Sequence, residues 1–301
     1  MQTIGLIAGK SGDSLTDELH KRGYKVAIVC GRLEEAGYDS ADERILLDLL
    51  EFEKIIRFFQ KKKVKKIIIG TGHYLVFNLV EKLEQAGFNT NIDIRKSLLA
   101  KDKVRFKKKL EEIRVDTPAY ASFLTREEFY KDGIAFPLPC VVKSNTDTVQ
   151  PKKINDIENL AEAAEDVFST NAVLLLEQYI QGNDCTVAVV NDGITVKSLG
   201  VLYYSKAKEY GLKGFDLAKS EIMSEEKEKE VCKIASDIVR KIGFSGLVRI
   251  DFIISEKIYV LELNSVIVTG YHGSAYPFFE KQGINIATEA INASLKILKE
   301  E

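Results

Sequence analysis

The chain has 301 residues, 45% of them hydrophobic and 29% charged, so it can bury a sizeable core and form two or three lobes. Its 43 basic and 45 acidic residues give a net charge of −2, which excludes an electrostatic drive toward nucleic acid or an anionic membrane. Four scattered cysteines without a C-x-x-C pair argue against a disulfide framework or zinc site and favour a reduced, cytoplasmic protein. We also expect no signal peptide and no membrane span, because the apolar runs are too short.

The first 95 or so residues alternate short apolar runs with segments of helical periodicity. Strands are expected at 3–8, 25–30, 65–70 and 88–94. Helices are expected at 14–22, 52–61 and 74–87. This alternation of strands and helices predicts a small, doubly wound parallel sheet.

Two glycine-containing loops follow strands of this sheet. Gly5–Ser11 resembles a phosphate-binding P-loop but is one residue short between its glycines, so we expect instead a mobile loop around Gly9 and Gly12. Gly70–His73 holds one of the three histidines. Because ligands of such sheets bind at the carboxyl ends of the strands, His73 is a candidate substrate contact, with a structural histidine as the alternative.

The rest of the chain predicts helices mixed with antiparallel strands. Helices are expected at 101–113, 156–168, 225–242 and 283–298, and strands at 140–143, 173–177, 185–190 and 195–203. The basic helix at 101–113 is interpreted mainly as a solvated face. Residues 205–222, rich in Lys, Gly and Tyr, predict a mobile loop.

The segment 249–264 predicts a β-hairpin with two different faces. One face is apolar: Ile250, Phe252, Ile254, Tyr259, Leu261 and Leu263. The other is polar: Arg249, Asp251, Glu262 and Asn264. A four-residue connection would place Asp251 opposite Glu262, where two carboxylates repel unless a cation lies between them. Such oxygen ligands suit Mg²⁺, and the alternative is a polar face in water.

With these elements in order, the chain resembles the ATP-grasp superfamily of D-alanine–D-alanine ligases and carbamoyl-phosphate synthase-like carboxylate–amine ligases. Lys103 is similar to the first nucleotide lysine of the family, and Lys143, at a strand end, to the second. The segment 177–184 is similar to the hinge that holds adenine, and the hairpin at 249–264 to the metal block. The resemblance implies an α/β and α+β fold: a parallel N-terminal domain (1–98), then a two-lobed ATP-grasp fold with antiparallel sheets (99–182 and 183–301).

The resemblance also implies roles for particular residues. The implied ATP ligands are Lys103, Lys143, Glu177, Gln178, Tyr179, Ile180 and Asp184, with backbone groups near Gln178–Ile180 on adenine and Asp184 on the ribose. The implied ligands of Mg²⁺, with Mn²⁺ as an alternative, are Asp251, Glu262 and Asn264. Arg249 would stabilise charge on the transferring phosphate, with a local salt bridge as the alternative. His73, Gly270 and Ser274 would line the acceptor site.

The implied activity is an ATP-dependent carboxylate–amine ligase that forms an acyl phosphate on a small amino acid, peptide or related carboxylate and releases ADP and phosphate. Its partners would be small-molecule carboxylates and amines, with a homodimer as the general expectation. Two departures stand out: residues 144–150 contain no glycine, and residues 265–274 lack the Pro-Gly turn of the D-alanine ligases. The alternatives are a carboxylase or carbamoyl-phosphate-type enzyme, and a nucleotide-binding module without turnover.

Overall fold

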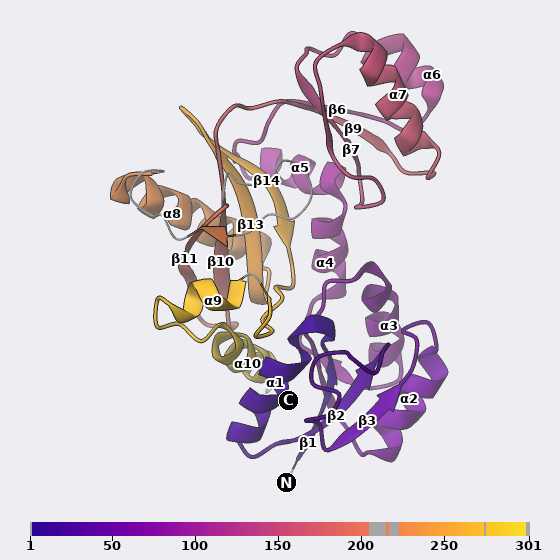
Figure 1. Ribbon diagram of the computed structural model, residues 1–301, viewed down its shortest axis with the longest axis vertical. Coiled ribbons are helices and arrows are strands. Elements are labelled where there is room, and N and C mark those ends of the chain that lie inside the picture. Colours follow the sequence, from indigo (N-terminus) through magenta and orange to yellow (C-terminus); the bar gives the residue numbers. More distant parts are fainter. Residues whose placement is uncertain (1, 205–214, 217–222, 274, 299–301) are drawn as a thin grey trace. The chain divides into compact units, whose positions relative to one another are not determined.

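The computed structural model describes residues 2–204, 215–216, 223–273 and 275–298 (Figure 1). The chain forms two compact units. The first unit comprises Met1–Ser97, Thr186–Ile250 and Asn264–Glu301, and the second comprises Leu98–Cys185 and Asp251–Leu263. The division into three segments at residues 98 and 182 stays a prediction. Among the residues described, no helix is both long enough and apolar enough to cross a membrane.

A five-stranded parallel sheet of order β3-β2-β1-β4-β5 lies in the first unit. Its strands are β1 Thr3–Ile7, β2 Lys25–Cys30, β3 Glu43–Leu46, β4 Lys66–Ile69 and β5 Asn89–Thr90. This sheet confirms the doubly wound parallel prediction. Two details differ: β3 was not predicted, because its four residues alternate between half-buried and exposed, and the strand expected at 88–94 is only two residues long.

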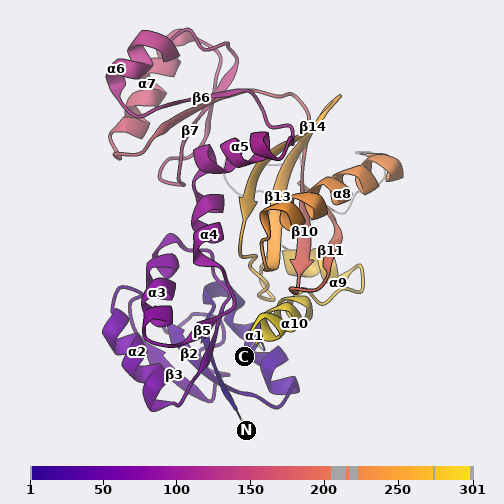
Figure 2. The same ribbon diagram turned by 180° about the vertical axis from the view of Figure 1, so that it is seen from behind.

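Helices cover both faces of this sheet, which explains why its strands are apolar at consecutive positions (Figures 1 and 2). On one face, α2 (Phe52–Lys61) and α3 (Tyr74–Gln85) pack against Ile7, Val29 and Ile67. On the other, α1 (Gly12–Lys21) and α10 (Ile286–Ile297) pack against Leu6 and Ile28. The first core therefore joins residues from both ends of the sequence.

Glu18 of α1 ties this helix to α10. Its carboxylate pairs with Lys21 at 2.7 Å and Arg22 at 2.6 Å, and accepts a hydrogen bond from the Thr288 hydroxyl at 2.9 Å. Burial raises the pKa of Glu18, but these partners outweigh burial and lower the pKa from 4.5 to about 2.

We expect the Glu18→Gln variant to lose about 2 kcal/mol of unfolding free energy at neutral pH. Because the folded pKa lies below the unfolded value, the contribution of Glu18 is complete above pH 4.5 and disappears as the pH falls toward about 2. Urea unfolding between pH 2 and 7 measures the free energy of unfolding of both proteins. The difference between wild type and variant should vanish at low pH, whereas the exposed Glu53→Gln control should match wild type throughout; a difference independent of pH contradicts the ion-pair explanation.

A second five-stranded sheet has the order β12-β11-β10-β13-β14. Its strands are β10 Asn183–Asn191, β11 Val196–Tyr204, β12 Phe215–Asp216, β13 Gly246–Ile254 and β14 Ile258–Asn264. In the first unit, α8 (Glu225–Ile242) is capped by Ser224 and ends at Gly243, whose φ of 77° favours glycine. Leu199 and Leu247 share a core there with α9 (Ala275–Glu280). The loop predicted at 205–222 lies outside the described residues except for β12.

The second unit contains an antiparallel sheet of order β6-β9-β7-β8. Its strands are β6 Tyr120–Phe123, β7 Cys140–Ser144, β8 Lys152–Ile154 and β9 Leu174–Gln178. The helix α7 (Ile157–Phe168) packs on this sheet near α6 (Arg126–Glu128) and a π-helical turn, Phe129–Gly133. This arrangement of a parallel domain followed by antiparallel sheets confirms the predicted fold class.

Two details of the second unit differ from the predictions. Where one helix was expected at 101–113, α4 (Ile94–Lys101) ends and α5 (Lys103–Glu112) begins, because the Asp102 carboxylate caps α5 by accepting from the N–H groups of Val104 and Arg105. In β14, Ile258 and Val260 are buried, whereas Tyr259 and Leu261, predicted on the apolar face, are half-buried. The Val260 N–H donates to the Asp116 carbonyl at 2.9 Å, so a segment distant in sequence contacts the backbone of this strand.

Candidate functional site

A cluster of lysines and carboxylates forms inside the second unit, from α5, β7, β9 and the loop after β7. Lys103 is the first residue of α5, and Lys107 follows one turn later on the same side of the helix. In the pairing of β7 with β9, Val141 faces Glu177 and Lys143 faces Leu175, so Lys143 and Glu177 are diagonal neighbours on one face. Helix period and strand register thus bring these four side chains together.

Glu177 lies between Lys107 and Lys143. Its Oε1 is 2.6 Å from Lys107 Nζ, and its Oε2 pairs with Lys143. Lys107 also donates to the Thr117 hydroxyl at 2.6 Å, and its Nζ lies 5.3 Å from the centre of the Tyr120 ring. Burial raises the pKa of Glu177, but the charges of Lys143 and Lys107 outweigh burial and lower the pKa to about 2. Burial lowers the pKa of Lys107, which Glu177 opposes only in part.

Lys103 pairs with two carboxylates. Its Nζ lies 2.5 Å from Asp147 Oδ1 and 3.3 Å from Glu262 Oε2, and Asp147 also pairs with Lys101. Burial lowers the pKa of Lys103, but Glu262 and Asp147 outweigh burial and raise it. Burial raises the pKa of Asp147, but Lys103 and Lys101 outweigh burial and lower it to about 2. Lys103, the predicted first nucleotide lysine, is therefore beside Glu262, a predicted metal ligand.

The glycine-free loop after β7 has its own internal order. The Ser144 hydroxyl accepts hydrogen bonds from the N–H groups of Thr148 at 3.2 Å and Val149 at 3.3 Å, and donates to the Thr146 carbonyl. The Asn145 side-chain Oδ1 accepts from the Val173 N–H at 3.1 Å, and the backbone carbonyl of Asn145 accepts from the Lys103 N–H at 2.8 Å. Serine and asparagine side chains therefore fix this loop where the resemblance implies glycine, and they direct Asp147 toward the lysines.

The predicted adenine hinge is partly engaged in the fold. The Gln178 N–H donates to the Ala119 carbonyl at 2.8 Å, and the Tyr179 N–H donates to the Pro139 carbonyl at 3.2 Å. A Cβ at Gly182 would lie 2.5 Å from the Ile254 carbonyl oxygen, so only glycine fits where the hinge passes β13. Lys153 Nζ lies 3.7 Å from the centre of the Tyr179 ring. The adenine contacts predicted for Gln178 and Tyr179 stay predictions, and their N–H groups already have partners.

The predicted metal ligands lie on β13 and β14. Asp251 is 8% exposed, and Asp251 and Glu262 both belong to the second unit, whereas Arg249 and Asn264 belong to the first. The Asn264 amide nitrogen is buried and has no hydrogen-bond partner within the described residues. Across the part of the chain that the structure describes, no three His, Cys, Asp or Glu side chains form a metal-holding group. The predicted set has two carboxylates and an amide, and its metal role stays a prediction.

The substrate candidates of the first unit have local structural roles. His73 caps α3: its Nδ1 accepts a hydrogen bond from the Leu75 N–H at 3.4 Å. A Cβ at Gly270 would lie 1.8 Å from the Lys10 carbonyl oxygen, so this glycine allows two backbones to meet. Ser274 lies outside the described residues. The substrate contacts predicted for His73, Gly270 and Ser274 stay predictions.

The P-loop-like segment forms the partner of the Gly270 loop. Gly9–Ser11 is a 3₁₀ turn that leads directly into α1, where the sequence predicted a mobile loop. The Ser11 hydroxyl is buried and accepts a hydrogen bond from the Thr269 N–H at 3.0 Å. The hydroxyls of Ser14 and Thr269 lie 3.4 Å apart. This segment therefore anchors the loop after β14.

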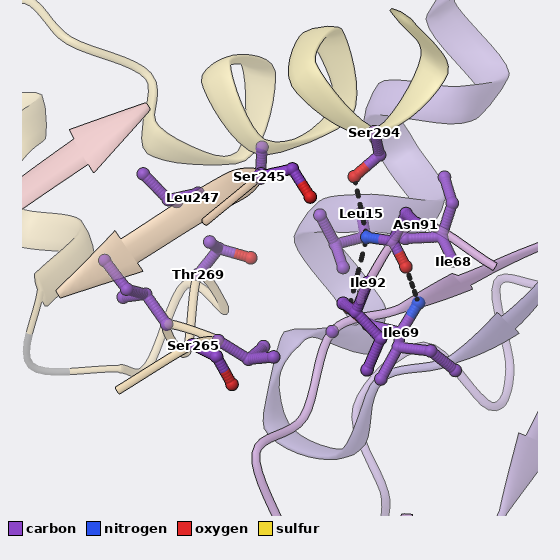
Figure 3. Close-up of a pocket in the computed structure, with 15 residues that line it drawn as sticks. Leu15, Ile68, Ile69, Asn91, Ile92, Ser245, Leu247, Ser265, Thr269 and Ser294 are labelled. Atoms are coloured by element: carbon purple, nitrogen blue, oxygen red, sulfur yellow. Dashed lines mark hydrogen bonds between the residues drawn. The ribbon is translucent and has the colours of Figure 1, made fainter. Parts of the chain in front are cut away.

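A small pocket lies behind this loop in the first unit (Figure 3). Asn91 forms one wall: its Oδ1 accepts from the Ile69 N–H at 2.7 Å, and its Nδ2 donates to the Ser294 hydroxyl at 2.9 Å. Ser245, Ser265 and Thr269 also line it. Because Oδ1 of Asn91 binds Ile69 of β4 and its Nδ2 binds Ser294 of α10, these contacts hold β4 and α10 together.

Comparison with known proteins assigns the family. A sequence model of the ATP-grasp domain matches residues 100–270, more than half of the chain, so the chain belongs to the ATP-grasp family. The D-alanine–D-alanine ligase of Francisella tularensis subsp. tularensis is 28% identical over 266 residues, which cover 85% of this chain and 82% of the relative. The large chain of carbamoyl phosphate synthase from Pyrococcus furiosus is 23% identical over 94% of this chain and 28% of its own length.

Solved structures show the same fold. The D-alanine–D-alanine ligase from Bacillus anthracis complexed with ATP has a TM-score of 0.75 at 19% identity, and the match covers 99% of both chains. The biotin carboxylase domain of the Hydrogenobacter thermophilus 2-oxoglutarate carboxylase, with MgADP, ADP and bicarbonate, has a TM-score of 0.83 at 18% identity, over 98% of this chain and 69% of that one. The family match and the D-alanine–D-alanine ligase relative confirm the prediction of an ATP-grasp enzyme.

Proposed function

We propose that this enzyme is an ATP-dependent carboxylate–amine ligase that acts through an acyl phosphate on a small amino acid, peptide or related carboxylate. The main support is the contact of Lys103 with Glu262 at 3.3 Å. Within one unit, this contact places a predicted nucleotide lysine beside a predicted metal ligand. A site for ATP with Mg²⁺ needs both kinds of group at the phosphates. The ligase relative matched over most of its length supports the C–N bond-forming reaction.

In the proposed complex, Lys103 and Lys143 bind phosphate oxygens, Asp184 accepts from the ribose, and the hinge at Ile180 binds the adenine edge. The residues that would hold Mg²⁺, or Mn²⁺, are Asp251, Glu262 and Asn264. Their fit rests on donor chemistry: all three offer the oxygen ligands that Mg²⁺ takes together with phosphates. The Asn264 amide nitrogen, which has no partner within the described residues, could donate to a phosphate. When bound, the metal neutralises phosphate charge.

The proposed reaction has two steps. An oxygen of the substrate carboxylate attacks the γ-phosphorus, the bond to the β-phosphate oxygen breaks, and ADP leaves from the acyl phosphate. The amine then attacks the acyl carbon, loses a proton, and displaces inorganic phosphate as the C–N bond forms. Arg249 stabilises the charge that develops on the transferring phosphoryl group or on the tetrahedral intermediate.

An assay of ADP and phosphate release across a panel of carboxylates and amines tests the proposal. We expect release that needs one carboxylate and rises with an amine, together with a product joined by a new C–N bond. If ADP forms only with bicarbonate or carbamate, the enzyme is a carboxylase or carbamoyl-phosphate-type enzyme. If ATP binds with Mg²⁺ but no carboxylate raises ADP release, the chain is a nucleotide-binding module.

We expect the Asp147→Asn variant to bind ATP about three- to tenfold more tightly than wild type. Asp147 pairs with Lys101 and Lys103, so a phosphate that binds Lys103 must displace this carboxylate. Calorimetric titration with ATP and Mg²⁺ measures the dissociation constant. Asp166→Asn is the matched control, because Asp166 pairs with Lys152 at 2.6 Å elsewhere in the second unit. Weaker binding by Asp147→Asn would mean that Asp147 orients Lys103 and does not compete with phosphate.

A further inference from the structure

Lys107 is not among the residues to which the family resemblance assigns a role, yet it is the most enclosed lysine of the cluster. The basic helix was interpreted mainly as a solvated face, but the Lys107 side chain is 0% exposed. Its ammonium group is surrounded by Glu177, the Thr117 hydroxyl and the Tyr120 ring. An enclosed ammonium with these partners cannot itself reach a ligand in solution.

The charges around Glu177 do not balance. We call Lys107, Glu177 and Lys143 the buried charge triad: it has two positive charges and one negative charge, with the carboxylate 3% exposed. A buried pair of one lysine and one carboxylate would already be neutral, and a further buried cation costs free energy unless an anion approaches it. With all three groups ionised, the triad therefore carries one excess positive charge. The charge of Glu262 also acts on Lys107, but Glu262 itself pairs with Lys103.

The excess charge is accessible only at Lys143. The Lys143 side chain is 12% exposed, against 0% for Lys107, so an anion from solution meets the triad at Lys143. Without Lys107, the pair of Glu177 and Lys143 would be neutral, and Lys143 would attract a phosphate only weakly. Lys107 occupies the Oε1 atom of Glu177 and thereby compensates the carboxylate from its enclosed side.

We infer that Lys107 is a positioning residue for nucleotide binding, which neutralises Glu177 and so keeps the ammonium charge of Lys143 available to the phosphates of ATP. This inference rests on the proposed function, because it assigns the phosphate to Lys143. It separates the three lysines by role: Lys103 and Lys143 contact the nucleotide, and Lys107 acts through Glu177. The role requires the charge of Lys107 and not merely its volume.

Calorimetric titration of the full chain with Mg-ATP, and separately with adenosine, tests the role of Lys107. The variants are Lys107→Met, which keeps the volume and removes the charge, and Lys107→Met combined with Glu177→Gln. The control is Lys108→Met, an exposed lysine of the same helix. Thermal unfolding of each variant verifies that it is folded.

We expect Lys107→Met to weaken ATP binding by about tenfold or more and to leave adenosine binding unchanged, because adenosine has no phosphate. Adding Glu177→Gln should restore ATP binding to within about threefold of wild type, since it removes the carboxylate that then neutralises Lys143. Lys108→Met should bind both ligands as wild type does.

Other results overturn the inference. Equal losses for ATP and adenosine, or no recovery in the double variant, would show that Lys107 only supports the packing of the site. ATP binding by Lys107→Met that equals wild type would show that Lys143 needs no help from Lys107. If the wild-type protein binds adenosine but not ATP, or binds neither, the proposed function itself is wrong. This outcome differs from those that contradict only the role of Lys107, in which the wild-type protein still binds ATP.

Discussion

Replacing Asp251 with Asn and Glu262 with Gln in one variant should lower ATP turnover by about a thousandfold or more. Both substitutions keep the shape of the side chain and remove the charge that would hold Mg²⁺. Asp251 is almost fully buried, and Glu262 pairs with Lys103 at 3.3 Å. The measurement is ADP release in the presence of Mg²⁺ and the best carboxylate–amine pair from the substrate panel.

The control for this experiment is Glu256→Gln, because Glu256 is exposed in the connection between β13 and β14 and lies outside the predicted ligand set. It should leave turnover unchanged. ATP binding measured without metal should persist in the double variant, since Lys103 and Lys143 remain. Normal turnover in the double variant would remove the metal assignment of Asp251 and Glu262.

The Gly270→Ala variant should lose about 1–3 kcal/mol of unfolding free energy and most of its turnover. The added methyl group would lie 1.8 Å from the Lys10 carbonyl oxygen, and both contacting groups are backbone, so one must move. To relieve this clash, the loop that contains Gly270 would move away from the turn at Gly9–Ser11. That movement would break the hydrogen bond from the Thr269 N–H to the Ser11 hydroxyl. Urea unfolding and ADP release measure the two effects.

The matched control is Gly31→Ala, because the nearest atom to its added methyl group is 4.0 Å away. It should change stability by less than about 0.5 kcal/mol. If Gly270→Ala keeps its stability and still loses turnover, Gly270 acts at the substrate, as the sequence predicted, and close backbone packing is not its main role.

The parallel domain was predictable because the apolar runs of its strands and the helical periodicity of its helices both indicate the same fold. Its strands are apolar at consecutive positions, and its helices show helical periodicity, so neither depends on a distant partner to be recognised. The short strands β3 and β5 were missed or overextended because they are edge strands with half-buried residues. The burial of β14 differs from the prediction, because tertiary packing decides which side of a strand is buried and alternation alone does not specify it.

The cluster was predicted only in part for a related reason. Lys103 and Lys143 stand at the start of a helix and near a strand end, where family motifs are recognisable. Asp147 and Lys107 act through ion pairs that join segments far apart in sequence. One signal for Lys107 was present: it follows Lys103 by four residues, which places both on one side of a helix. The run of lysines around it concealed that signal.

The packing of α10 against the parallel sheet has a consequence for synthesis on the ribosome. The helix α1 covers part of this face early, but Ile291 and Leu298 complete the core around Leu6 and Leu19, so the part covered by α10 remains exposed until residues 286–298 have been translated. During that interval the nascent chain exposes an apolar surface of the kind that chaperones bind and that promotes aggregation. Translation that stops before residue 286 should therefore release an aggregation-prone product, although every strand of the sheet has already been made.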